Sequence, residues 1–178
     1  MSDPLIVSAV LAAGAQDDLD ARRRRWFPAE RLQVGAHLTL FHALPGDRAP
    51  EVAAALRELT GERPAPAITV GEAFGLGRGV AVRTPSPALK EIRATIADRF
   101  RDDLTAQDAR PWRPHLTLQN KVGPDEARRT LASVRADHTP YDTVVEALAL
   151  WRYRHGPWEA AGEFRFGPGA GRTTRSCT

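Results

Sequence analysis

The chain has 178 residues, of which 42% are hydrophobic and 26% are charged, and its formal net charge is +3. These values are typical of one compact domain with a sizeable apolar core, and they exclude a polycationic nucleic-acid coat. Cys177 is the only cysteine, so no disulfide framework can form, and no apolar run reaches the roughly 18 residues that a membrane helix needs.

The N-terminal part of the chain predicts a buried strand followed by a helix. Leu5–Leu11 is a short apolar run, and the residues before it carry Asp3 and no Lys or Arg, which does not fit a secretory signal. An acidic segment at 17–20 precedes the basic run Arg22–Arg25, an order that suits the dipole of a helix. Pro28 is expected to stop that helix. The arginine run is typical either of an RNA-binding patch or of a solvated helix end.

The middle of the chain predicts strands that alternate with helices. Apolar residues at helical spacing mark two helices, and in the second of them Arg93 lies largely off the apolar stripe. The glycine-rich segment Gly75–Gly79 is predicted to be a hairpin turn rather than a nucleotide-binding loop, because no helix follows it. The expected elements are a strand at 36–44, a helix at 51–59, strands at 68–74 and 80–83, and a helix at 86–100.

The last third of the chain continues with strands and one further helix. Pro114 fixes an extended approach to a strand, and Pro124 occupies the first turn of a helix. The expected elements are that helix, at 125–134, and strands at 143–153 and 158–166 around a hairpin at His155-Gly156-Pro157. Residues 167–178 are expected to form a flexible tail. The order of elements predicts an α+β fold in a single bilobal domain, residues 1–166, because no linker divides it.

One stretch of the chain occurs twice. His37-Leu38-Thr39-Leu40 is repeated letter for letter as His115-Leu116-Thr117-Leu118, about 78 residues further on. Each copy is followed by four more residues with strand character, a turn pair of proline and glycine, and an acidic start to a helical pattern. The shared order of strand, turn and helix indicates two similar halves that each contribute one strand to a shared site.

Strand geometry places the polar residues of both copies on one face. Successive side chains of a strand point to opposite faces, so the histidine and threonine of each copy lie together and the leucines form the core side. Phe41 continues the polar face in the first copy, as do Gln119 and Lys121 in the second. Two such rows facing each other would form a cleft suited to a phosphate. The alternative is a pair of buried strands with hydrogen-bonded histidines.

The pair of H-x-T motifs resembles that of the 2H phosphoesterase superfamily, which includes 2′-5′ RNA ligase-like proteins and cyclic phosphodiesterases. The resemblance extends from the strand near Leu5 to the strand that ends near Phe166. It implies a bilobal fold of two pseudo-symmetric halves, whose antiparallel sheets flank a central cleft with the helices outside. It also implies a metal-independent phosphodiesterase that opens 2′,3′-cyclic phosphates of RNA ends or nucleotides. The same arrangement could also join a 5′-hydroxyl to a 2′,3′-cyclic end, which would be 2′-5′ RNA ligation.

The resemblance also implies a role for each motif residue. His37 and His115 would act as general acid and general base, and the hydroxyls of Thr39 and Thr117 would hold the non-bridging phosphate oxygens. No metal or other cofactor is implied. An imidazole, with a pKa of about 6.5, can take either role near neutral pH. The sequence does not assign the two roles, although the resemblance favours His115 as the base.

Further substrate contacts are predicted from strand phase and from position in the chain. Five residues are candidates: Phe41 by stacking on a base, Gln119 and Lys121 beside the second motif, and Trp112 and Arg113 at the rim of the cleft. His42 alternates out of phase with His37 and is expected in the core or in a second layer.

Two other functions stay open from the sequence. A non-catalytic RNA- or nucleotide-binding module of the same fold would not turn over a cyclic nucleotide. A zinc hydrolase built on His37, His42 and His115 is disfavoured, because the chain has no H-E-x-x-H motif and no cysteine cluster. For the phosphodiesterase we expect RNA ends or small cyclic nucleotides as partners, no membrane contact, a monomer and a cytoplasmic location.

Overall fold

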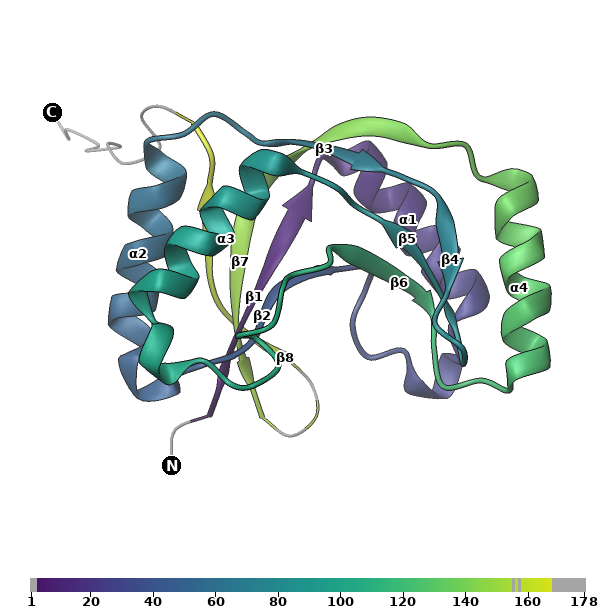
Figure 1. The fold of residues 1–178 in the computed structure, drawn as a ribbon, viewed down its shortest axis with the longest axis horizontal. Coiled ribbons are helices and arrows are strands. Elements are labelled where there is room, and N and C mark those ends of the chain that lie inside the picture. Colours follow the sequence, from purple (N-terminus) through teal and green to yellow (C-terminus); the bar gives the residue numbers. More distant parts are fainter. Residues whose placement is uncertain (1–2, 155, 157, 168–178) are drawn as a thin grey trace, which may run out of the picture.

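The structure is a computed structural model that describes residues 3–154, 156 and 158–167. Its strands are β1 (Leu5–Leu11), β2 (Leu38–Leu44), β3 (Ala67–Val70), β4 (Ala73–Gly75), β5 (Val80–Arg83), β6 (His115–Gln119), β7 (Tyr141–Tyr153) and β8 (Trp158–Arg165) (Figure 1). Its helices are α1 (Ala13–Trp26), α2 (Ala49–Gly61), α3 (Pro87–Arg99) and α4 (Pro124–Asp137). Single 3-10 turns lie at 29–31, 46–48 and 101–103.

The strands form two antiparallel sheets that meet at the two motif strands. In the five-stranded sheet β1 lies between β2 and β7, and the long strand β7 also pairs with β8 and with β3. In the three-stranded sheet β5 lies between β4 and β6. The motif strands β2 and β6 are therefore end strands of different sheets, and they contact each other. This contact between two sheet edges creates the space in which the motif side chains lie.

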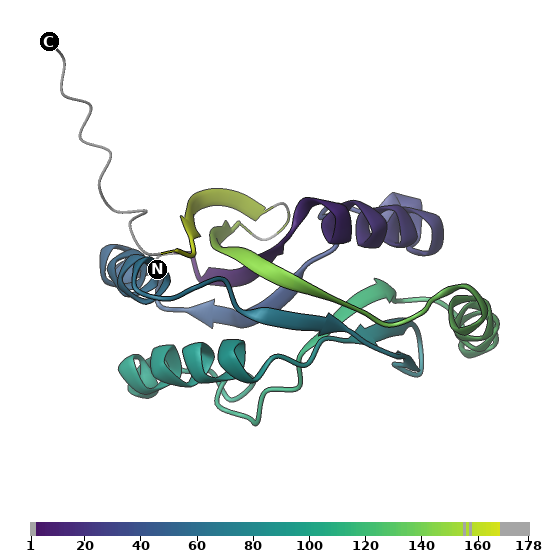
Figure 2. The same cartoon turned by 90° about the horizontal axis from the view of Figure 1, so that it is seen from above.

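The helices pack around the sheets, as Figures 1 and 2 show from two directions. Helix α1 packs against β1 and β6, α2 against β7 and β8, and α4 against β4 and β5, while α3 contacts α2. Local sequence sets where two of them begin. The Ser86 hydroxyl accepts a hydrogen bond from the Leu89 N–H at the start of α3, and Pro124 occupies the first turn of α4.

The leucines of both H-L-T-L copies lie in the apolar core. Leu38, Leu40, Leu116 and Leu118 are each at most 1% exposed. Burying four leucines favours one orientation of each motif strand, since each such side chain gains on the order of 2 kcal/mol from burial. The histidine and threonine of each copy are thereby turned away from this core.

Each motif strand contains a β-bulge at the same position of the repeat. The pairing of β2 with β1 skips Leu40, and the pairing of β6 with β5 skips Leu118. An extra residue in one strand reverses the alternation of side chains beyond it. Phe41 and His42 in β2 and Gln119 in β6 therefore lie on the face opposite to the one that simple alternation predicts. A second register shift in β2 lies between Phe41 and Leu44, and Leu44 is again in the core.

The α+β fold with antiparallel sheets and outer helices is confirmed. Several elements begin or end up to three residues away from the predicted bounds, and one predicted strand is divided. The segment 68–74, predicted as one strand, is divided into β3, which joins the larger sheet, and β4, which joins the smaller one. The chain changes sheets at Gly71, whose N–H donates to the Arg83 carbonyl. The hairpin predicted at 155–157 falls in part, and the tail from 168 onward wholly, outside the described residues. In the described part of the chain, no helix is long and apolar enough to cross a membrane.

Candidate active site

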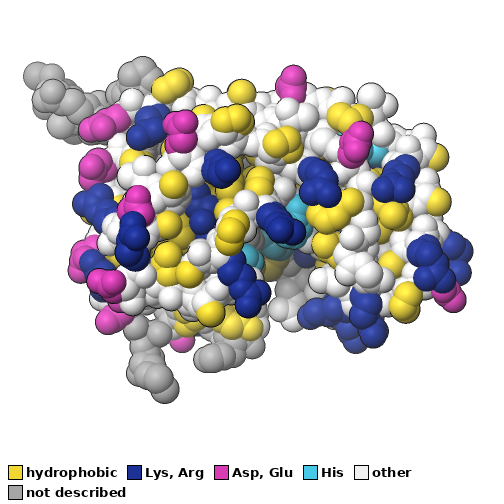
Figure 3. All heavy atoms as spheres, viewed as in Figure 1, with side chains coloured by type: hydrophobic (Ala, Val, Ile, Leu, Met, Phe, Trp, Pro, Cys, Tyr) yellow, Lys and Arg dark blue, Asp and Glu magenta, His cyan; other side chains and the backbone are white. Residues whose placement is uncertain are grey.

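A cavity of about 550 Å³ opens between the two motif strands. His37 and Thr39 from the first copy and His115 and Thr117 from the second copy all line it. Figure 3 shows histidine side chains in a hollow near the middle of one face of the molecule, with Lys and Arg side chains around it. The structure thus brings the four motif side chains together in one cavity of a size that suits a nucleotide.

The two motif histidines are oriented in the same way. The Nδ1–H of His37 donates to the Gly35 carbonyl, and the Nδ1–H of His115 donates to the Arg113 carbonyl, each over 2.8 Å. Because a carbonyl can only accept, Nδ1 must carry the proton in both rings. In each neutral ring Nε2 is then the atom with a free lone pair, available to exchange a proton with a ligand.

The two histidines differ in their surroundings. His37 is partly buried against the ring of Trp158, with ring centroids 4.7 Å apart, whereas His115 is exposed and meets the edge of Phe74 at 5.9 Å. Burial is the main cause that lowers the pKa of His37 from 6.5 to about 4. The hydrogen bond to the Gly35 carbonyl opposes this effect, and the charge of Arg23 adds to it. His37 is therefore neutral at pH 7 and can accept a proton.

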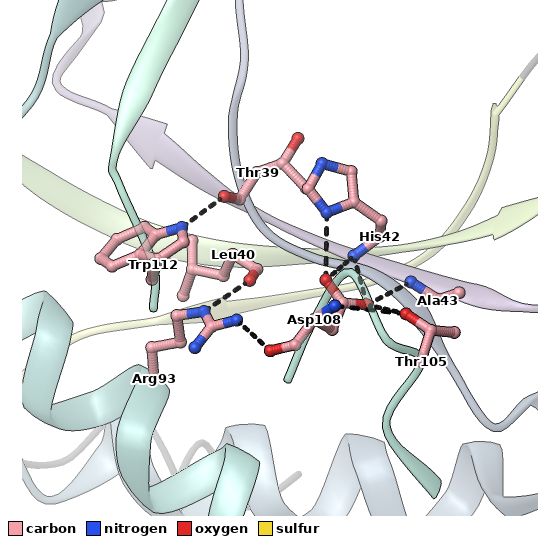
Figure 4. A network of polar contacts seen from close by, with 8 residues as sticks. All are labelled: Thr39, Leu40, His42, Ala43, Arg93, Thr105, Asp108 and Trp112. Atoms are coloured by element: carbon pink, nitrogen blue, oxygen red, sulfur yellow. Dashed lines mark hydrogen bonds and ion pairs between the residues drawn. The ribbon is translucent and has the colours of Figure 1, made fainter. Parts of the chain in front are cut away.

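Two buried arginines hold the backbone of the motif strands next to the bulges. Arg93 of α3 donates to the carbonyl of Leu40 over 2.9 Å and to that of Asp108 over 2.7 Å (Figure 4). Arg23 of α1 donates to the carbonyl of Thr117 over 2.5 Å. Both side chains are at most 8% exposed, and burial lowers the pKa of each. Each motif strand is thus supported by one desolvated guanidinium, the first by Arg93 and the second by Arg23.

The sequence prediction is wrong for both of these arginines. Arg93 was expected largely off the apolar stripe of its helix, but its guanidinium lies inside, where backbone carbonyls accept its hydrogen bonds. Within Arg22–Arg25, Arg23 points inward, whereas Arg22 and Arg25 pair with Asp137 at the surface. Helical periodicity does not reveal a buried arginine whose partners are carbonyls, because those carbonyls become available only through the tertiary fold.

Three of the predicted substrate contacts do not lie on the cavity. Phe41 is fully buried in the core, and Gln119 is 1% exposed with its side-chain amide donating to the Thr130 hydroxyl. Both follow a bulge, so their side chains point to the core face instead of the motif face. Lys121 is exposed but does not line the cavity, and its backbone has a positive φ of 64°. These three residues were predicted from the alternation of side chains along each strand, and that alternation is interrupted at the bulges.

The two rim residues do line the cavity. Trp112 is partly buried, and its indole N–H donates to the Thr39 carbonyl over 3.1 Å (Figure 4). Arg113 is exposed beside it. Trp112 and Arg113 also border a neighbouring groove of about 530 Å³, together with Phe74 and Arg83. A groove with two aromatic rings and two guanidinium groups next to His115 suits a flat, polar ring.

A third imidazole lies in the cavity, contrary to the expectation from strand phase. His42 follows the bulge at Leu40, so it returns to the cavity side, and its side chain is 50% exposed. Its Nδ1–H donates to Asp108 over 3.0 Å. The sequence carries one signal of this arrangement. The consecutive apolar pair Leu40-Phe41 breaks the alternation of the strand just before His42.

The zinc site considered from the sequence would need His37, His42 and His115 to converge on one ion. Among the residues that the structure describes, no group of three or more His, Cys, Asp or Glu side chains is arranged to hold a metal. The Nδ1 atoms of all three rings are engaged with protein acceptors.

Comparisons with known proteins identify relatives of this fold. The family model described as the 2′-5′ RNA ligase superfamily matches residues 11–157. The chain is similar to the crystal structure of TT0787 from Thermus thermophilus, with a TM-score of 0.62 and 16% identity over 93% of this chain and 99% of that one. It is also similar to Escherichia coli LigT complexed with NADP+, with a TM-score of 0.60, 17% identity and the same coverage, and to LigT complexed with 3′-AMP. Among curated protein sequences none matches.

Proposed function

The chain belongs to the 2′-5′ RNA ligase superfamily, and on that premise we propose that it is a metal-independent phosphodiesterase that opens 2′,3′-cyclic phosphates of RNA ends or nucleotides. The observation that carries the proposal is the pair of Nδ1-anchored imidazoles in one cavity that Thr39 and Thr117 also line. Hydrolysis of a cyclic phosphate requires a base, an acid and donors for the phosphate oxygens. The four motif side chains can supply all three.

In the proposed reaction, water attacks the phosphorus opposite the departing ribose oxygen. One imidazole takes the proton of the attacking water at Nε2, and the other gives its Nε2 proton to the ribose oxygen as the bond from phosphorus to that oxygen breaks. The product is a ribose phosphomonoester with one free hydroxyl. Thr39 and Thr117 donate hydrogen bonds to the non-bridging oxygens, where negative charge gathers in the transition state.

The assignment of base and acid rests on the surroundings of His37. A base must begin neutral, and the lowered pKa of His37 keeps its ring neutral at pH 7. We therefore assign the base to His37 and the acid to the more exposed His115 for hydrolysis. This assignment is the opposite of the one that the family resemblance favours. In 2′-5′ ligation, the 5′-hydroxyl of a second RNA end replaces the attacking water, and each histidine keeps its role.

The nucleoside of the substrate is proposed to lie in the groove beside His115. Phe74 and Trp112 offer ring surfaces there, and Arg83 and Arg113 offer cations. Trp112 and Arg113 border both this groove and the motif cavity, so a nucleotide can reach from one to the other. LigT, to which the chain is similar, has been crystallised with 3′-AMP and with NADP+, and these ligands support a nucleotide as the substrate.

The proposal is tested by the turnover of 2′,3′-cyclic AMP by the purified protein in excess chelator. We expect conversion to a phosphomonoester at a rate that the chelator does not change, because acid, base and phosphate donors are all side chains. Activity that the chelator abolishes and that zinc or manganese restores would contradict the metal-independent mechanism. Tight nucleotide binding without turnover would favour the alternative, a non-catalytic nucleotide-binding module.

A further inference from the structure

His42 is held at one wall of the motif cavity by a buried carboxylate. Asp108, whose side chain is 1% exposed, accepts hydrogen bonds from the His42 ring and from the backbone N–H groups of His42 and Ala43, all within 3.0 Å (Figure 4). Its own backbone carbonyl accepts from Arg93. The ring of His42 is therefore tied through Asp108 both to strand β2 and to helix α3.

The hydrogen bond to Asp108 fixes which ring atom faces the cavity. A carboxylate accepts the Nδ1 proton, so Nε2 is the nitrogen of His42 that remains open to a ligand. Figure 4 shows that this second ring nitrogen points away from Asp108. Orientation of an imidazole by a carboxylate on its far nitrogen also occurs among functional histidines, where it sets the tautomer and the direction of the free nitrogen.

The charges around His42 favour an anion. Of the described residues that line the cavity, Asp108 alone is acidic, whereas Arg93, Arg110 and Arg113 are cationic. Burial on its own would raise the pKa of Asp108, but the hydrogen bonds from the His42 ring and from the backbone N–H groups of His42 and Ala43 lower it. The carboxylate is thus ionised and occupied by its hydrogen bonds. The exposed guanidinium of Arg110 remains available on the same loop.

His42 has no role in the proposed reaction. Acid, base and oxyanion donors all come from the two H-x-T motifs, yet the cavity is far larger than one phosphate group and His42 lines it together with both motif histidines. We propose that His42, as an imidazolium whose Nδ1–H donates to Asp108, donates its Nε2–H to a second phosphate of the substrate, the one on the 5′ side of the ribose that carries the cyclic phosphate. This inference rests on the proposed function and narrows it. With this contact, the cavity should bind RNA ends and 5′-phosphorylated cyclic nucleotides more tightly than nucleosides that carry a cyclic phosphate alone.

The inference is tested by calorimetric binding of two inert ligands that differ by one phosphate. Adenosine 3′,5′-bisphosphate carries the second phosphate and adenosine 3′-monophosphate lacks it. We expect the wild type to bind the bisphosphate roughly 10-fold more tightly or better, because a charge-assisted hydrogen bond in a partly buried site has that magnitude. The measured quantity is the ratio of the two dissociation constants, which a general loss of stability does not change.

Two substitutions of His42 separate its free nitrogen from its structural contact. His42→Asn keeps a donor near Nδ1 for Asp108 but lacks the Nε2 atom, so the ratio should fall to roughly 2-fold or less. His42→Gln places an amide nitrogen near the Nε2 position, so it should restore part of the ratio. Lys90→Asn removes an exposed cation of α3 outside the cavity and should keep the wild-type ratio. A thermal unfolding curve for each variant establishes that it is folded.

The possible outcomes separate the inference from the proposed function. Equal affinity of the wild type for both ligands, or an unchanged ratio in His42→Asn, would overturn the role of His42 while leaving the nucleotide site in place. Failure of the wild type to bind either ligand would overturn the nucleotide site and, with it, the inference.

Discussion

Single backbone carbonyls set the chemistry of the motif histidines. Each ring donates Nδ1–H to the carbonyl two residues earlier in the chain, so both Nε2 atoms are left free by the same local geometry. The strand repeat predicts which residues are present, but the tautomer depends on a carbonyl that lies before the strand. That contact could not be inferred from side-chain periodicity.

The lowered pKa of His37 predicts a dependence of stability on pH. The pKa of this ring is about 4 in the folded chain and about 6.5 when it is exposed, so the unfolded state binds more protons between these values. The resulting stabilisation is present above pH 6.5 and is lost as the pH falls to 4, by up to roughly 3 kcal/mol. Denaturant unfolding of the wild type and of His37→Asn, in which the amide can still donate to the Gly35 carbonyl, measures this difference. If His37→Asn showed the same slope of unfolding free energy against pH as the wild type, the lowered pKa of His37 would be contradicted.

At the scale of single elements, the bulge in each motif strand decides which residues share the cavity. The sequence predicts the two strands, their leucine face and the facing H-x-T pairs, because these depend on alternation within four residues. Alternation fails beyond Leu40 and Leu118, so Phe41 and Gln119 are in the core and His42 is in the cavity. A bulge depends on pairing with a strand distant in sequence, and a single strand pattern does not specify it.

Arg93 supports the bulge in β2, and we expect its removal to be costly. Arg93→Met leaves the carbonyls of Leu40 and Asp108 without their donor, which should lower the free energy of unfolding by roughly 2–6 kcal/mol, at about 1–3 kcal/mol for each of the two buried groups that lose their partner. The matched control is Arg99→Met on the same helix. Arg99 forms an exposed pair with Glu58, so its loss should cost less than about 1 kcal/mol. Denaturant unfolding of both variants measures the difference, and equal costs would show that Arg93 is not a support of the bulge.

The hairpin between β4 and β5 must approach β6 closely. A Cβ at Gly79 would overlap the Gln119 carbonyl oxygen and lie 2.7 Å from the Asn120 Cα, whereas a Cβ at Gly14 in α1 would meet nothing within 4 Å. Gly79→Ala should therefore destabilise the protein by roughly 3 kcal/mol, the cost of forcing an extra carbon into packed backbone. Gly14→Ala should be neutral or should stabilise by up to about 1 kcal/mol. A Gly79→Ala variant with the melting temperature of the wild type would mean that this contact does not constrain β6.

At the scale of the whole molecule, the two motif strands are supported in the same way, but the side chains around the two motif histidines differ. Each half provides an H-x-T strand with a bulge, and a buried arginine donates to the backbone of each of these strands. Among the described residues, the first half adds a third imidazole to the cavity, His42, and the second motif histidine, not the first, borders the aromatic groove with Trp112. The repeat in the sequence predicts the feature that the two halves share, an H-x-T strand in each. The unlike part is built by segments between the repeats, in particular the loop that carries Asp108, Arg110 and Trp112, and loop geometry is not encoded in periodicity.

The proposed mechanism requires that two imidazoles from the two halves act as one acid–base pair. The measurement that tests it most directly is the turnover of 2′,3′-cyclic AMP by His37→Ala, by His115→Ala and by the double variant, each in excess chelator. We predict that each single change lowers turnover by about 10²–10⁴-fold. The double variant should lose less than the product of the two single losses, because the pair acts as a unit. If both single variants kept near-full turnover, the two histidines would not be the acid and base, and the catalytic assignment of the cavity would be wrong.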